Sequence, residues 1–142
     1  MSVRGSVLAQ REGTGPFGSA IETVDLDKSW EGLHFLLSGS KEPSSHPEGF
    51  LVGHSSLPNT GEAEVFHYRV AQVRAINEAL QRCTPEVLQQ RYDGRLMREF
   101  NVYPACEWGV ADCEYLLEYY ERLRQFVARH AAEQNELLVV IC

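Results

Sequence analysis

The sequence predicts a single α+β domain in which a small mixed β-sheet packs against several helices. Apolar residues recur with helical spacing in several segments, and short β-type runs stand among them without regular βαβ alternation. The length of 142 residues suits one domain, and 44% hydrophobic with 23% charged residues is typical of a chain that buries its own core. We therefore expect residues 1–142 to form one domain.

The N-terminal part is expected to begin with a strand and a loop. Residues 6–10 form a β-type run, and three glycines and a proline between residues 12 and 19 exclude a helix or a central strand there. A short buried helix is then expected over residues 28–38, with Asp27 as N-cap and Gly39 as the C′ residue. Its apolar face carries residues spaced i, i+3, i+4 and i+7: Trp30, Leu33, His34 and Leu37.

The middle of the chain predicts two strands followed by helices. Residues 50–53 are expected as a buried strand, and residues 64–68 as a second strand after a loop. A helical stripe covers residues 70–83, and a further helix begins at the N-cap Thr84. That helix breaks near Asp93 and Gly94, and a short helix is expected over residues 95–100.

The C-terminal part contains the longest expected helix, over residues 112–133, after an aromatic loop over residues 103–109. The chain then ends in a continuous apolar run over residues 137–141 that is rich in β-branched residues. Such a run is typical of a central strand, because both of its faces are buried. A long C-terminal helix followed by a terminal strand is therefore expected.

Charge and composition exclude several classes of function. The net charge of −7 has the wrong sign for nucleic-acid binding, and Arg91, Arg95 and Arg98 are read as a solvated helix face. No apolar stretch is long enough to span a membrane, and the first residues lack the pattern of a signal peptide. The four cysteines form no CxxC pair, so we expect free thiols and a cytoplasmic location.

Two blocks of the sequence resemble one family. The segment from Asp25 to Gly39, DLDKSWEGLHFLLSG, resembles the LDxDKxWxxLHxLLTG signature of the YfbM-like family of bacterial domains of unknown function. Arg91-Tyr92-Asp93, with Tyr103-Pro104 and Trp108, is similar to the second block of that family. The resemblance covers residues 21–142 and implies the same α+β fold, but it implies no reaction. Residues 1–20 depart from it, because a glycine-rich loop stands where family members have a helix.

A polar cluster of uncertain role lies in the first block: Asp25, Asp27, Lys28 and His34. A carboxylate that orients an imidazole is a general-base arrangement, so a hydrolase or transferase using Asp27 and His34 is one hypothesis. Cys106 is an alternative nucleophile. The structural interpretation is that Asp27 caps the helix and that His34 is a hydrogen-bonded core residue.

A second candidate site is the aromatic loop with its acidic neighbours, which would be a binding surface: Tyr92, Tyr103, Trp108, Glu107 and Asp112. Tyr and Trp are favoured anchors of protein interfaces, although they also serve as core residues. No metal site is predicted, because the spacing of His46, His54 and His67 matches no metal motif. No cofactor is predicted either, since no GK[ST] follows the glycine-rich loop.

These patterns favour a protein-binding module over an enzyme. An acidic single domain without a recognisable catalytic set fits a partner-binding role, and its charge fits a basic partner. An immunity or antitoxin-like inhibitor is the specific form that charge and size suggest. The sequence does not determine the oligomeric state. A concave site with converging titratable groups would favour the enzyme, and a flatter acidic or aromatic surface would favour the binding module.

Overall fold

The structure is a computed structural model that describes residues 2–15 and 18–142. Its sheet has four strands in the order β2-β1-β4-β3. The strands are β1 (Gly5–Gln10), β2 (Ala20–Asp27), β3 (Glu64–Tyr68) and β4 (Glu136–Ile141). The helices are α1 (Trp30–Ser38), η1 (Pro47–Gly49), α2 (Val70–Arg82), α3 (Pro85–Arg91), α4 (Gly94–Glu99) and α5 (Val110–Ala132).

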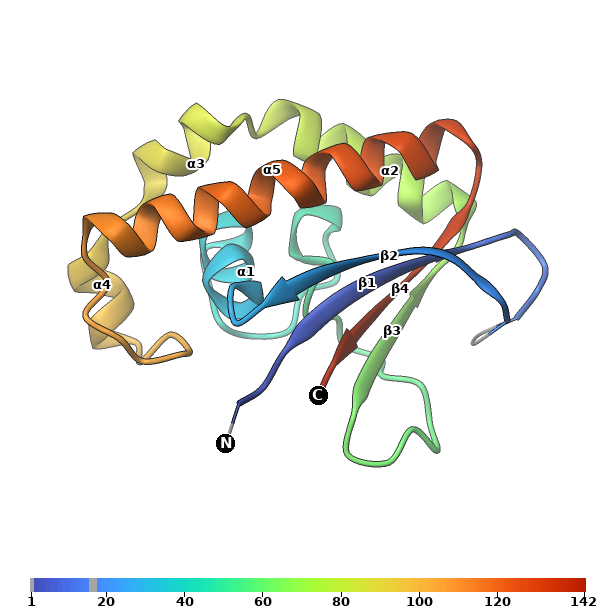
Figure 1. Ribbon diagram of the computed structural model, residues 1–142, viewed down its shortest axis with the longest axis horizontal. Coiled ribbons are helices and arrows are strands. Elements are labelled where there is room, and N and C mark those ends of the chain that lie inside the picture. Colours follow the sequence, from blue (N-terminus) through green and yellow to red (C-terminus); the bar gives the residue numbers. More distant parts are fainter. Residues whose placement is uncertain (1, 16–17) are drawn as a thin grey trace.

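All three strand pairings are antiparallel, so the sheet is not mixed as the sequence suggested. The terminal strand β4 lies between β1 and β3, which confirms its predicted central position. Both termini lie on the same side of the molecule (Figure 1), and the main chains of Arg4 and Cys142 exchange hydrogen bonds of 2.8 and 2.9 Å. Strands β2 and β3 are the two edges of the sheet.

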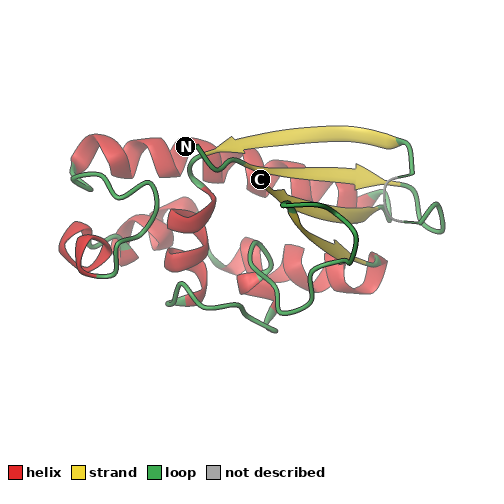
Figure 2. Cartoon of the chain, turned by 90° about the horizontal axis from the view of Figure 1, so that it is seen from below, coloured by secondary structure: helices red, strands yellow, loops and turns green. Residues whose placement is uncertain are grey.

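The helices cover one face of the sheet and extend beyond one end of it. In Figure 1 the long helices α2 and α5 run side by side above the strands, while α3 and α4 lie past the end of the sheet. Figure 2 shows the same division, with the strands gathered toward one end of the molecule and helices alone at the other. Helix α5 contacts both β2 in the sheet and α3 beyond its end.

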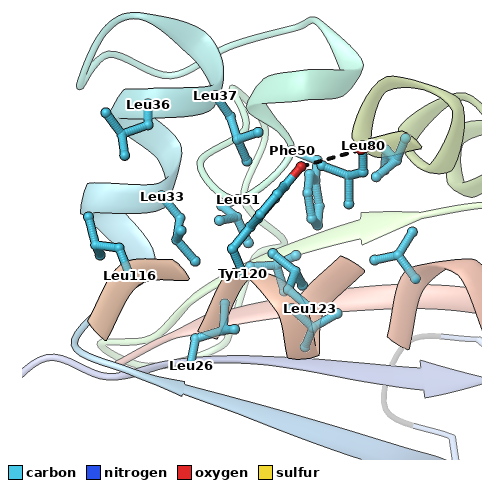
Figure 3. Close-up of a cluster of buried hydrophobic side chains, with 14 of the residues drawn as sticks. Leu26, Leu33, Leu36, Leu37, Phe50, Leu51, Leu80, Leu116, Tyr120 and Leu123 are labelled. Atoms are coloured by element: carbon cyan, nitrogen blue, oxygen red, sulfur yellow. Dashed lines mark hydrogen bonds between the residues drawn. The ribbon is translucent and has the colours of Figure 1, made fainter. Parts of the chain in front are cut away.

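The core lies where α1, α2, α5 and the sheet meet. Tyr120 of α5 is fully buried, and its hydroxyl donates to the main-chain oxygens of Cys83 and Leu80. Figure 3 shows this side chain pointing between the leucines of α1 and Leu80 of α2. Gly32 lets α1 approach α5, since a Cβ there would lie 2.9 Å from Leu116 Cδ2. The structure thus confirms the predicted α+β class and the long helix before a terminal strand.

Three local expectations were wrong. Residues 50–53 form a turn and an isolated bridge rather than a strand. Phe50 and Leu51 are nevertheless buried, with exposures of 1% and 0%, because the core accepts their side chains from this turn. Strand β2 (Ala20–Asp27) is absent from the sequence prediction, which places no strand between the glycine-rich loop and the first helix. The N-cap of α1 is Ser29 and not Asp27. Asp27 has a φ of 50° and precedes Trp30, the first helical residue, by three positions.

The predicted N-cap Thr84 is confirmed, because its side chain accepts a hydrogen bond from Val87 N at the start of α3. Asp93, predicted only as the end of that helix, also caps α4, since its side chain accepts a hydrogen bond from Leu96 N. Gly39 adopts the left-handed conformation expected of the residue after α1. Within the described ranges, no helix is long and apolar enough to cross a membrane.

Candidate functional site

The structure separates the members of the predicted polar cluster. Asp25, Asp27 and Lys28 lie beside Arg4 and Tyr115, whereas His34 contacts Glu42. Asp27 Oδ2 accepts a hydrogen bond of 2.6 Å from the hydroxyl of Tyr115, and its Oδ1 lies 3.0 Å from Arg4. The Tyr115 hydrogen bond is the main cause that lowers the pKa of Asp27, and the Arg4 charge adds to it. Asp25 lies 3.6 Å from Arg4, and Lys28 donates its main-chain N–H to Tyr115. These contacts fasten the end of β2 to α5.

His34 belongs to the core and not to this cluster. Its side chain is 0% exposed, and its Nε2 lies 2.8 Å from the main-chain oxygen of Glu42. Because a carbonyl oxygen only accepts, Nε2 carries the proton of this neutral imidazole. Burial lowers the pKa of His34, although the hydrogen bond to Glu42 opposes that shift. Asp27 and His34 therefore have separate partners and form no carboxylate–imidazole pair.

The aromatic loop is fixed by its own hydrogen bonds. Trp108 is 3% exposed, and its indole N–H donates to Val102 O at 3.2 Å. The hydroxyl of Tyr103 accepts the main-chain N–H of Val3 at 2.7 Å, while its ring lies 5.9 Å from that of Trp30. An indole buried in this way presents almost no surface to a partner.

The remaining members of that predicted surface are partly exposed. The hydroxyl of Tyr92 donates to Gly109 O at 2.7 Å, and burial raises its pKa to about 12. Asp112 caps α5, because its Oδ2 accepts the N–H of Gly109 at 2.7 Å. Glu107 is exposed, and its main-chain oxygen accepts from Arg98. Glu107 is thus the member whose side chain is most available to solvent.

Cys106 is not prepared as a nucleophile. Burial raises the pKa of its thiol, and the nearby negative charge of Asp112 raises it further. The reactive species of a cysteine is the thiolate, which these surroundings disfavour.

A concave site lies at the edge of the sheet between α2 and β3. This α2–β3 pocket has a volume of about 300 Å³. Two loop segments, residues 44–47 and 53–55, form one side of it, and a parallel bridge between Ser44 and Gly53 joins them. Residues 66–68 of β3 and three residues of α2 complete the lining: Gln72, Ala75 and Ile76.

The lining of the α2–β3 pocket combines apolar surface with hydroxyl groups, one amide side chain and three histidines. Pro47, Tyr68 and Ala75 are half-buried and provide the apolar surface, with the buried Phe66 and Ile76 beneath it, while His46 and His54 are exposed at the loops. Hydroxyl groups come from Ser44, Ser45 and Ser55. None of the described residues that line the pocket is Asp, Glu, Lys or Arg. A volume of this size and this mixture suit a small ligand or one or two side chains of a partner.

The three histidines considered from the sequence all line this pocket, yet they do not gather into a metal site. His67 Nε2 lies 2.9 Å from Glu136 Oε1, so this nitrogen is already engaged by a carboxylate. Among the described residues, no group of three His, Cys, Asp or Glu side chains is placed to hold a metal ion.

The Glu136 carboxylate also connects β3 to the first loop. It accepts a hydrogen bond of 3.2 Å from Gln10 Nε2, and that same nitrogen contacts Gly15 O at 2.7 Å. Burial raises the pKa of Glu136, but hydrogen bonds from His67, Gln10 and Gly13 outweigh burial and leave it lowered. The ionised carboxylate therefore holds β3 firmly beside the pocket.

Sequence reasoning found the three histidines but not the pocket. The sequence predicts a surface loop up to residue 49 and a strand over residues 50–53, and it does not show that the bridge between Ser44 and Gly53 brings residues 44–47 and 53–55 together on one side of a pocket. The α2 residues of the lining belong to a helix whose inward face was expected in the core. The one available signal was the presence of His46, His54 and His67 within a short span.

Comparison with known proteins supports the fold. Residues 9–140 match the family described as "Domain of unknown function (DUF1877)". The structure is similar to that of the Escherichia coli protein YfbM, described as a protein of unknown function, with a TM-score of 0.77 and 19% sequence identity over 98% of this chain and 99% of YfbM. No curated protein matches the sequence. At that identity the likeness to YfbM shows a shared fold alone.

Proposed function

The chain belongs to the DUF1877 family, and from this premise we propose that it is a protein-binding module whose partner occupies the α2–β3 pocket. The observation that carries the proposal is that the lining of this pocket holds no Asp, Glu, Lys or Arg and includes the half-buried apolar surface of Pro47, Tyr68 and Ala75. Such a lining accepts an uncharged side chain without leaving a buried charge unpaired. The segment of the partner that enters the pocket is therefore uncharged.

The contacts of the polar cluster favour binding over the hydrolase or transferase alternative. Asp27 is engaged by Tyr115 and Arg4, and His34 by Glu42. A general base must reach the proton that it abstracts, and the fully buried His34 does not face solvent. The raised pKa of Cys106 points the same way.

Charge supports a basic partner around the pocket. The chain carries a net charge of −7, and three acidic residues lie close in sequence to the lining segments: Glu48, Glu62 and Glu64. Within the part of the chain that the structure describes, none of the three forms an ion pair. Arg69 and Arg74 stand beside the lining residues Tyr68 and Ala75 and, among the described residues, form no ion pair either. The preference for a partner that carries Lys or Arg therefore rests on the net charge of −7.

The specific form that we propose is an immunity or antitoxin-like inhibitor acting in the cytoplasm. Proteins that act on nucleic acid present basic surfaces, and an acidic module complements them. The four free cysteines fit a reducing compartment.

The test is capture of the partner from cells that make the protein, with two tryptophan variants of α2. Ala75 lines the pocket, whereas Ala71 is exposed on the same helix and lies outside the lining. Ala75→Trp should fill the pocket and lose the partner that the unmodified chain captures. Ala71→Trp should keep the partner, and thermal melts should show that both variants fold. An Ala75→Trp variant that captures the same partner equally well would remove the pocket from consideration.

A further inference from the structure

The outer edge of β3 is only partly paired. Val65 donates its N–H to Ser56 Oγ at 3.0 Å and accepts the N–H of Leu57 at 2.8 Å on its carbonyl oxygen. Both groups of Val65 therefore point away from β4, and the preceding loop satisfies them.

His67 lies two residues further along β3, and its main-chain N–H and C=O have no such partner. In an antiparallel pair, successive residues alternate between facing the neighbouring strand and facing away from it. His67 lies opposite Leu138 in the register and shares the outward orientation of Val65. Across residues 2–15 and 18–142, no residue beyond the sheet hydrogen-bonds to the main-chain N–H or C=O of His67. An unpaired donor and acceptor on a strand edge form a template for another strand.

The α2–β3 pocket opens at this point. The loop runs beside β3 at Leu57, where it pairs with Val65. Gly53 and Ser55 line the pocket together with His67, without a main-chain hydrogen bond to that residue. The unpaired edge and the uncharged lining thus meet, and together they match an extended chain that carries an uncharged side chain.

From this geometry we infer that the partner binds by strand addition, as an extended segment whose main chain pairs with the N–H and C=O of His67. One uncharged side chain of that segment enters the pocket against Tyr68 and Ala75. The inference rests on the proposed function and specifies the conformation of the bound segment. Main-chain pairing supplies affinity in this mode of recognition, and the pocket supplies specificity.

The experiment uses seven-residue peptides selected from a random displayed library against the full chain. For the tightest peptide, each amide N–H is replaced in turn by N-methyl, and the Kd of every version is measured. Methylation of the N–H that donates to His67 O should weaken binding by about tenfold or more. Methylation of the next N–H along the peptide is the matched control and should change Kd by less than about twofold, because alternate groups point to the opposite side.

Hydrogen exchange of the His67 amide gives a second readout. That amide should exchange freely in the chain alone and become protected when the peptide binds. The variant His67→Ala keeps the main-chain N–H and should still bind, while His67→Pro removes the N–H and should lose binding. The N-methyl scan decides the question even if His67→Pro does not fold.

The possible results separate the two proposals. A peptide that Ala75→Trp excludes, but that tolerates N-methylation at every position and leaves His67 exchange unchanged, would support the pocket and overturn strand addition. A library that yields no peptide sensitive to Ala75→Trp would overturn both.

Discussion

Gly32 of α1 faces Leu116 of α5 so closely that a Cβ on the glycine would lie 2.9 Å from Leu116 Cδ2. The same Cβ would lie 3.2 Å from the ring of Trp108. Glycine normally lowers the stability of a helix, so its presence as the third residue of α1 reflects the packing of the helices. Contact between α1 and α5 thus depends on the absence of one side chain.

We expect Gly32→Ala to lower the free energy of unfolding, by roughly 1–3 kcal/mol, because the added methyl overpacks this contact. Helix propensity alone would give the opposite sign, a gain of about 1 kcal/mol. Chemical denaturation measures the difference. In a Leu116→Ala background the same substitution should cost nothing or stabilise, and an equal loss in both backgrounds would show that overpacking is not the cause.

Replacing His34 should reveal its role in the core. His34→Ala removes a fully buried ring and its hydrogen bond to Glu42, so we expect a loss of roughly 1–3 kcal/mol. Unchanged stability after this substitution would contradict the structural role.

The titration of His34 also makes stability depend on pH. Its pKa in the folded chain lies below the ordinary value of 6.5, so the unfolded chain binds a proton more readily. Stability from this group is complete above pH 6.5 and falls as the pH drops from 6.5 toward the lowered pKa. Melts across this window should show a smaller decline for His34→Ala than for the unmodified chain, and parallel declines would exclude the effect.

Trp108 should act on stability rather than on partner affinity. The indole is 3% exposed, so Trp108→Ala should cost roughly 3–5 kcal/mol by leaving a cavity. Tyr103→Phe removes only the hydroxyl that accepts the N–H of Val3, and we expect a loss of roughly 0.5–1.5 kcal/mol. Thermal melts beside binding kinetics separate the effects. A stably folded Trp108→Ala variant with a raised off-rate would restore the aromatic loop as an interface.

The four cysteines should be reduced and should differ in reactivity. Alkylation of the unreduced, unfolded protein should add a label at each thiol, and a missing label would show a disulfide. In the folded protein, Cys142 should react first because it is exposed. Cys106 should react more slowly because its pKa is raised, and the buried Cys83 and Cys113 should react last.

Association with the partner should depend on salt. The on-rate should fall with rising ionic strength while the off-rate changes little, because screening acts over a Debye length of about 10 Å at 0.1 M. A Glu64→Lys variant should slow association as added salt does. Glu107→Lys on the aromatic loop is the matched control, because it changes the net charge by the same amount and Glu107 does not line the pocket. A larger effect of Glu107→Lys would place the partner at the aromatic loop instead.

Periodicity in the sequence was sufficient for most helices and for the terminal strand. The stripes of α2 and α5 and the cap Thr84 depend on neighbours a few residues away, which the sequence displays directly. The run over residues 137–141 identified a buried strand because it has no polar face. The resemblance to YfbM-like domains likewise depended on a continuous segment.

Tertiary contacts decided the rest. Phe50 and Leu51 are as apolar as strand residues, but the core accepts them from a turn, and a short apolar run cannot distinguish the two. Strand β2 is an edge strand with exposed residues, so its pattern is weak. Asp27 has the chemistry of an N-cap, yet Tyr115 lies 88 positions away in the chain and takes its carboxylate. The α2–β3 pocket exists because residues 44–55 fold back against β3, and such long-range closure leaves no local pattern.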